Sequence, residues 1–209
     1  MSQATANAAQ RAHTHIRAAI LSGELTAGSM LSESALATSL SVSRTPVRAA
    51  LSRLQDEGFV TIYPKRGALV RELTAHEVRE AAQVRHALET EGIQLASPDA
   101  RRSLGKRLED NLKQQKKALD HKDFHAFATL SMQFHRTFAE LSNNTLMLAC
   151  YDRFQDRQYL SILRNPTVSS NPDLMIDEHR ALLADAVAGD WVNFSTLLRE
   201  HQSHGHALE

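Results

Sequence analysis

The sequence has almost no cysteine and no long apolar run. Cys150 is the single cysteine among 209 residues, so no disulfide can form within the chain, and a reducing cytoplasm is the expected location. No apolar run approaches the roughly 18 residues that a membrane-spanning helix needs. Residues 1–10 lack the charged segment and apolar stretch of a secretory signal. We therefore expect a cytoplasmic protein with no membrane partner.

Net charge is also absent, which taken alone argues against a nucleic-acid partner. The charges are unevenly distributed, however. Residues 1–71 contain eight Lys and Arg against four Asp and Glu, giving +4, and residues 72–209 contain sixteen against twenty, giving −4. A basic N-terminal third joined to an acidic remainder indicates one part that meets phosphate and one that does not.

The first third of the chain changes its hydrophobic period from helix to strand. Apolar spacing predicts helices at 9–22 and 33–40, and a third that follows the turn at Ser41 and is ended by Gly58. Residues 59–63 and 68–70 then read as two strands of a β-hairpin with a basic tip. This order is that of a winged helix-turn-helix.

The rest of the chain is predicted to be helical. Thr74 and Glu77 have the spacing of a capping box that opens a helix running to about residue 96. Further helices are expected at about 99–119, 123–142, 145–163, 173–188 and 190–206, with a polar loop at 165–172. The predicted fold class is mainly α, with a winged helix-turn-helix over residues 1–72 and an all-helical bundle over residues 73–209.

The second helix of a helix-turn-helix enters the major groove of DNA with its N-terminal residues at the base edges. Arg44 and Arg48 lie one turn apart at that end of the helix, on the face opposite its apolar stripe, and arginine can pair bidentately with guanine. Phosphate contacts are expected from Ser43 and Thr45 at the helix start. Lys65 and Arg66 at the wing tip are expected to lie over a phosphate backbone or the minor groove, with Gly67 allowing close approach. For any one of these arginines, the alternative interpretation is a solvated surface side chain without a DNA contact.

Residues 42–48 (VSRTPVR), with 31–33 (LSE), 50–54 (ALSRL) and 66–67 (RG), resemble the GntR family of bacterial transcription regulators. The resemblance implies that Arg44, Arg48, Arg66 and Gly67 contact an operator. The chain departs from the pattern at three positions. Ser34 replaces a frequent DNA-contacting arginine, Ser41 replaces a turn glycine, and Ala49 replaces a frequent glutamate. A serine at that turn is strained if its φ is positive.

Residues 75–206 resemble the all-helical FCD effector domain of the FadR subgroup, through residues 85–89 (RHALE), 134–135 (FH), 141–144 (LSNN), 178–179 (EH) and His201. The resemblance implies that His135, His179 and His201 hold a divalent metal. It also implies that the metal holds a carboxylate effector whose acid group pairs with Arg85. Three imidazoles with open coordination positions suit Zn or Ni, and Arg can clamp a carboxylate through two hydrogen bonds.

Ser131 weakens the metal interpretation, because relatives that hold the metal usually carry Asp or Asn at this position. Two alternatives stay open: a metal-free, histidine-lined pocket that binds an acid directly, and histidines without a common role.

The sequence as a whole predicts a ligand-responsive regulator that binds a palindromic DNA operator as a homodimer. One rival is an architectural DNA-binding protein with a vestigial sensor. A second is an enzyme with a His-bound metal, which is disfavoured because Glu178 and His179 are adjacent on a helix and point about 100° apart. No catalytic residue is predicted.

Overall fold

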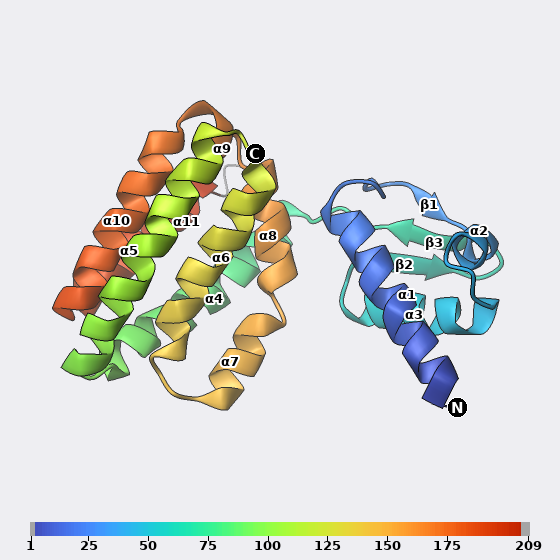
Figure 1. Ribbon diagram of the computed structural model, residues 1–209, viewed down its shortest axis with the longest axis horizontal. Coiled ribbons are helices and arrows are strands. Elements are labelled where there is room, and N and C mark those ends of the chain that lie inside the picture. Colours follow the sequence, from blue (N-terminus) through green and yellow to red (C-terminus); the bar gives the residue numbers. More distant parts are fainter. Residues whose placement is uncertain (1–2, 206–209) are drawn as a thin grey trace. The chain divides into compact units, whose positions relative to one another are not determined.

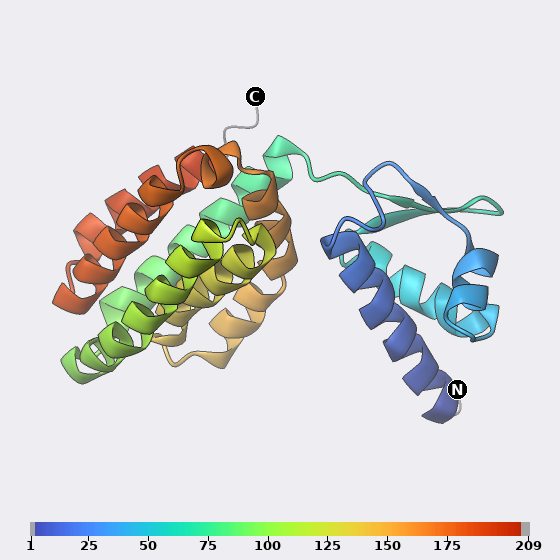
Figure 2. The same cartoon turned by 45° about the horizontal axis from the view of Figure 1, so that its top comes forward.

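The computed structural model describes residues 3–205, which fall into two compact units with their boundary between Leu73 and Thr74. The described chain is mainly α-helical with one small sheet, as the ribbon diagrams show (Figures 1 and 2). The fold class expected from the sequence is thereby confirmed. The unit boundary lies one residue after the one predicted.

The N-terminal unit contains three helices, α1 (Gln3–Leu21), α2 (Glu33–Ser39) and α3 (Arg44–Asp56). Ser32 caps α2, because its side-chain oxygen accepts a hydrogen bond from the backbone N–H of Ala35 at 3.4 Å. Pro46 lies in the first turn of α3, where its missing N–H costs little. The apolar stripe of α3 is buried against α1, as its spacing predicts: Val47, Leu51 and Leu54. The helix predicted at 9–22 begins earlier, at Gln3.

The turn between α2 and α3 is left-handed at Ser41, whose φ is +52°. An L-residue pays a steric cost in this region that glycine does not pay. The turn is nevertheless closed by backbone hydrogen bonds, among them one of 3.0 Å from Val42 N–H to Ala37 O. The strain expected for a non-glycine residue at this position is therefore present.

The sheet has three antiparallel strands, β1 (Met30–Leu31), β2 (Val60–Tyr63) and β3 (Gly67–Val70), in the order β1-β3-β2. The hairpin of β2 and β3 was predicted. Strand β1 was not predicted, because two residues are too few to show an alternating pattern. Gly67 has a φ of +105°, and a Cβ there would collide with the carbonyl oxygen of Leu31.

The C-terminal unit is a helical bundle (Figure 2). Its elements are α4 (Ala75–Leu95), α5 (Pro98–Asp120), α6 (Phe124–Glu140), α7 (Thr145–Asp152), α8 (Gln155–Arg164), α9 (Pro166–Ser170), α10 (Pro172–Ala188) and α11 (Trp191–Gly205). The capping box that opens α4 is present, with Glu77 N–H donating to Thr74 and Thr74 N–H donating to the Glu77 carboxylate. Helix α5 packs against α6 and α10, and α4 packs against α6 and α11.

Two predictions in this unit were wrong. The helix expected at 145–163 is interrupted after Asp152, and the chain resumes as α8 at Gln155. The loop expected at 165–172 contains the short helix α9, capped by Asn165, whose side-chain oxygen accepts from Thr167 N–H at 2.9 Å. The segment is polar and contains proline, which is typical of a loop, but Asn at the cap with Pro at the first helical position is also a helix start.

The core of the bundle brings α4 and α6 unusually close. Gly92 on α4 faces the backbone carbonyl of Phe138 on α6, and no Cβ could be accommodated there. Phe134 and Phe138 on α6 are fully buried in the main apolar cluster, together with Leu182 on α10 and Leu198 on α11. This packing fixes the helices whose inner faces carry the candidate site. Within residues 3–205, no helix has both the length and the apolar character required to cross a membrane.

Candidate functional site

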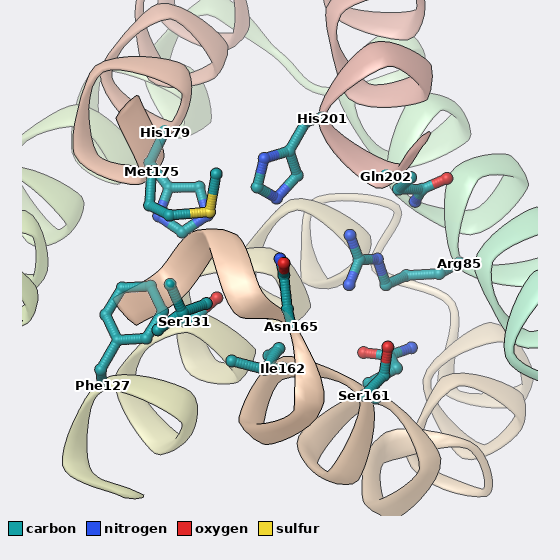
Figure 3. Close-up of a pocket in the computed structure, with 12 residues that line it drawn as sticks. Arg85, Phe127, Ser131, Ser161, Ile162, Asn165, Met175, His179, His201 and Gln202 are labelled. Atoms are coloured by element: carbon teal, nitrogen blue, oxygen red, sulfur yellow. The ribbon is translucent and has the colours of Figure 1, made fainter. Parts of the chain in front are cut away.

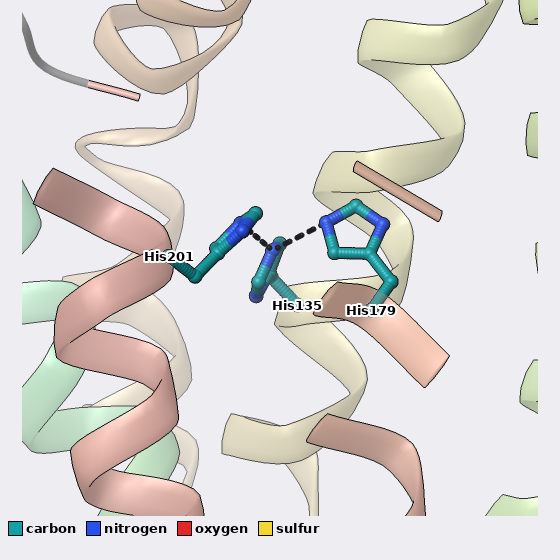
Figure 4. Close-up of side chains that lie close together, drawn as sticks. All are labelled: His135, His179 and His201. Carbon is teal, nitrogen blue, oxygen red and sulfur yellow. Dashed lines mark hydrogen bonds between the residues drawn. The ribbon is translucent and has the colours of Figure 1, made fainter. Parts of the chain in front are cut away.

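Three histidines from three helices meet inside the bundle. The Nε2 atom of His135 on α6 lies 3.3 Å from Nε2 of His179 on α10 and 3.2 Å from Nε2 of His201 on α11 (Figure 4). One ligand atom from each ring lies within 4.8 Å of the other two. The sequence prediction that these residues belong together is therefore matched by their positions.

In each ring the second nitrogen, Nδ1, is hydrogen-bonded to a neighbouring side chain. Nδ1 of His135 lies 2.8 Å from Glu89, Nδ1 of His179 lies 2.7 Å from Gln115, and Nδ1 of His201 lies 2.7 Å from Glu178. An amide oxygen and an ionised carboxylate both accept, so with Glu89 and Glu178 ionised each Nδ1 can carry the proton, and each Nε2 can then present its lone pair to the centre. Such outer partners orient metal-binding histidines and raise their basicity.

The sequence did not reveal these outer partners. Glu178 was considered only in relation to its neighbour His179, whereas the structure places its carboxylate on His201 of the facing helix. Gln115 is fully buried on α5, among charged residues whose pattern gave no reason to single it out. The one available signal was Glu89, which lies one helical turn from Arg85.

Burial keeps the two innermost histidines neutral. The pKa of His135 is lowered well below its usual value by desolvation and then by the positive charge of Arg85. The pKa of His179 is lowered in the same direction, by desolvation and then by the neighbouring His201. Neutral imidazole is the form that binds a metal.

Arg85 is not an isolated cation in this site. Its Nε lies 3.0 Å from the Glu89 carboxylate, and both side chains are buried. The Tyr151 hydroxyl donates a further hydrogen bond of 3.2 Å to the same carboxylate. Burial raises the pKa of Glu89 to about 8, while Arg85 and the Tyr151 hydrogen bond act in the opposite direction. Glu89 therefore links the arginine to the first histidine of the cluster.

A cavity of about 40 Å³ opens beside the histidines. Figure 3 shows Arg85 reaching into it from α4, with His179 on the opposite side and His201 between them. The apolar part of the lining is Phe127, Ile162, Val168 and Met175, and the polar part includes Ser131 and Gln202. Ser131 is 3% exposed, so its hydroxyl group stands where a buried carboxylate is expected in metal-holding relatives.

Helix α8 provides a wall of the cavity that the sequence analysis missed. Gln158, Ser161, Ile162 and Asn165 line the cavity and recur at helical spacing on one face. The three polar members of this set are buried, with exposed fractions of 6% to 8%. A polar stripe at helical spacing was visible in the sequence. Its direction was not, because α8 was read as part of one longer helix.

The arrangement fits a metal ion. Zinc–nitrogen bonds of 2.0–2.1 Å at tetrahedral angles place ligand nitrogens roughly 3.3–3.4 Å apart, and the two shorter Nε2 separations are 3.2 and 3.3 Å. Three protein ligands leave at least one coordination position for a small molecule from the cavity. The cluster can thus hold a metal with an open position.

In the N-terminal unit, the residues expected to contact DNA are exposed. Ser43, Arg44, Thr45 and Arg48 lie at the N-terminal end of α3, opposite its buried stripe. Lys65 and Arg66 are exposed in the turn between β2 and β3, and Gly67 is half-buried at the start of β3. Arg48 donates from Nε to the Glu33 carboxylate at 2.6 Å, a partner that the sequence analysis did not anticipate.

Comparison with known proteins identifies the class. Residues 8–70 match the family described as bacterial regulatory proteins, gntR family, and residues 80–204 match the FCD domain. The chain belongs to the GntR family of transcription regulators and carries an FCD domain, consistent with the FadR-like subgroup. Members of this family are regulators and not enzymes, which removes the enzyme alternative.

Individual relatives are also described as transcription regulators. A HTH-type transcriptional regulator of Streptomyces ambofaciens is 30% identical over 191 residues, which cover 89% of this chain and 78% of that protein. The HTH-type transcriptional repressor RspR of Escherichia coli K12 is 32% identical over 116 residues, 56% of this chain and 51% of RspR. The gluconate operon transcriptional repressor of Bacillus licheniformis is 32% identical over 148 residues, with 69% and 59% covered.

Two solved structures share the fold. A GntR transcriptional regulator from Rhodococcus sp. RHA1 superposes with a TM-score of 0.80 at 22% identity, covering 95% of each chain. McbR/YncC of E. coli superposes with a TM-score of 0.72 at 20% identity, covering 94% of this chain and 93% of the other. At these identities, the likeness concerns the arrangement of helices and strands alone.

Proposed function

We propose that this transcription regulator is switched by a small carboxylate bound to a metal on His135, His179 and His201. The observation that carries the proposal is the set of three Nε2 atoms directed at one point, each ring fixed through its Nδ1. A buried Nδ1–H needs an acceptor whatever the role of the ring, so the convergence of the three Nε2 atoms is the feature that indicates a shared role. Three imidazole ligands favour Zn or Ni over Mg or Ca, which prefer oxygen ligands.

Charge explains why the metal and the acid belong together. Arg85 contacts the Glu89 carboxyl group at 3.0 Å, so not all of its hydrogen-bond donors are available to an anion. A divalent cation beside the cavity adds the positive charge that a carboxylate needs, and it favours the ionised form of Glu89. We therefore favour the metal-dependent site over a metal-free pocket, with Arg85 orienting the acid group.

The DNA part of the proposal rests on α3 and the wing. Arg44 and Arg48 are exposed at the N-terminal end of α3, where they can reach base edges in the major groove. We propose phosphate contacts from Ser43, Thr45, Lys65 and Arg66, with Gly67 allowing close approach. A homodimer would bind a palindromic operator in the cytoplasm, because two-fold protein symmetry matches two half-sites.

The first test measures metal content. The protein purified from zinc- and nickel-replete medium is expected to contain about one metal ion per chain by elemental analysis, and His179→Ala to contain almost none. His76→Ala is the matched control, because His76 is exposed on α4 away from the cluster. A wild-type protein without metal, or a His179→Ala protein that keeps it, would refute the metal proposal.

The second test measures coupling between the two units. Operator duplexes are selected from a random pool, and their affinity is measured by fluorescence anisotropy with and without short carboxylic acids. Because coupling is reciprocal, an acid that weakens operator binding must itself bind more weakly when operator is present. Arg85→Ala should lose the acid response and keep operator affinity. Operator binding that is indifferent to metal and to every acid supports the architectural alternative.

A further inference from the structure

The cavity contains a hydrogen-bond acceptor with nothing to accept from. Gln158 on α8 is 6% exposed, and among the described residues its Oε1 has no partner. The other buried side-chain atoms in the described chain that lack a partner, such as those of His13 and Asp185, are outside the lining of this cavity. A buried amide oxygen without a hydrogen bond costs free energy, so this acceptor calls for a donor.

The rest of the lining limits what that donor can be. Arg85 and the histidines form the polar side that receives an acid group, whereas Phe127 and Met175 form an apolar side. An ammonium group in this space would be repelled by Arg85 and by a metal on the cluster. A neutral hydroxyl meets no such repulsion and can donate to Gln158.

Size narrows the class further. A water molecule needs roughly 10–15 Å³ of such space, and the cavity offers about 40 Å³. The enclosed space beside the histidines is therefore small, which favours a short carbon chain over a bulkier acid.

We infer that Gln158 is the specificity-determining residue of the effector site and selects a short hydroxy-carboxylate through a hydrogen bond from the ligand's hydroxyl to Oε1. The inference rests on the proposed function, because it assumes that an acid binds beside the metal. It adds the ligand's second functional group and the residue that recognises this group.

The test compares four-carbon acids that differ by one group. Binding of butyrate, 2-hydroxybutyrate, 3-hydroxybutyrate and 2-aminobutyrate to the zinc-loaded full-length protein is measured by calorimetry. One of the two hydroxybutyrates is expected to bind at least about tenfold more tightly than butyrate, because a site built around a hydrogen bond rejects the analogue that lacks it. The position of the preferred hydroxyl follows from which isomer is bound.

Two variants assign the preference to Gln158. Gln158→Leu and Gln158→Met remove the amide and are expected to bring the ratio of hydroxybutyrate to butyrate affinity below about threefold. The ratio of the two affinities is the readout, and circular dichroism checks separately that both variants are folded. Gln155→Leu is the matched control on the same helix, because Gln155 does not line the cavity, and it should keep the full preference.

The outcomes separate the two proposals. If the wild-type protein binds butyrate and the hydroxybutyrates equally, or prefers 2-aminobutyrate, the inference fails and the metal-dependent acid site stands. A preference that survives in both Gln158 variants also overturns it. If no acid binds to the zinc-loaded protein, both proposals fail together.

Discussion

Replacing Gln115 with leucine tests how much the orientation of His179 contributes to metal affinity, because His179 itself is unchanged. Gln115 is fully buried on α5, and its Oε1 accepts the hydrogen bond of 2.7 Å from Nδ1 of His179. Its own amide nitrogen donates to Asn111 at 2.7 Å, and Asn111 donates to the backbone of Leu130 on α6 at 3.1 Å. The variant leaves all three imidazoles in place and removes one support.

The expected loss of metal affinity is about tenfold. Removing an outer partner of a metal ligand costs roughly 10- to 100-fold in affinity, or about 1.4 to 2.8 kcal/mol. The lower end applies here for two reasons. Gln115 is a neutral acceptor, so it raises the basicity of the imidazole less than a carboxylate does. Stacking against Phe134, at a centroid distance of 4.7 Å, still holds the ring of His179 after the substitution.

The assay is zinc competition against a chromophoric chelator at pH 7.5. Gln114→Leu is the control, because Gln114 is the exposed neighbour on the same helix and should bind zinc as the wild type does. Gln115→Glu keeps an acceptor for Nδ1–H and should bind zinc more tightly than Gln115→Leu, although its second oxygen loses the hydrogen bond that the amide nitrogen donates to Asn111. Wild-type affinity in Gln115→Leu, within twofold, would show that the acceptor does not act on the metal and would refute the reasoning.

Three further predictions concern stability and DNA. In metal-free protein, urea unfolding followed by the fluorescence of Trp191, the single tryptophan, should show stability falling below pH 6.5. The reason is that the unfolded chain then binds two protons that buried His135 and His179, with their lowered pKa values, do not bind, which outweighs the one proton that Glu89 holds in the folded state through its raised pKa. His179→Gln should reduce this slope by about 1.4 kcal/mol per pH unit, and an unchanged slope would contradict it. Gly92→Ala should destabilise the bundle by at least about 2 kcal/mol in the same assay, because its Cβ would meet the backbone of α6; a loss under 0.5 kcal/mol would exclude that collision. Arg44→Ala and Arg48→Ala should each weaken operator binding by about 1–3 kcal/mol and relax specificity, checked by anisotropy on matched and mismatched duplexes.

The sequence predicted the fold well where local signals and tertiary packing agree. The capping box at Thr74 begins α4 as expected, and the stripe of Val47, Leu51 and Leu54 is buried as expected. The fold prediction failed where one sequence pattern is compatible with two local structures. Asn165 followed by Pro166 is compatible with a turn and with a helix start, and the packing of Val168 decides for the helix.

The sequence predicted the three histidines of the site, but it did not predict the residues around them that orient the histidines or line the cavity. The family resemblance, through the residues that flank each of them, grouped three of the eleven histidines of the chain. Glu89, Gln115 and Gln158 are common residue types whose role depends on which way each helix faces. The direction in which each helix faces is set by contacts between helices distant in sequence, such as the approach of Gly92 to α6. A single sequence does not reveal these contacts.

The short strand β1 has a consequence for how the N-terminal unit folds. Its pairing with β3, Met30 with Leu69 and Leu31 with Ala68, closes a loop that contains both helices of the helix-turn-helix. A contact between residues so far apart in the chain depends on the order of the segment between them. The β1–β3 pairing therefore makes the unfolding of the N-terminal unit more cooperative. The wing and helix α2 therefore belong to one folding unit. Amide hydrogens of α2 and of the wing should accordingly exchange with solvent in a single opening event.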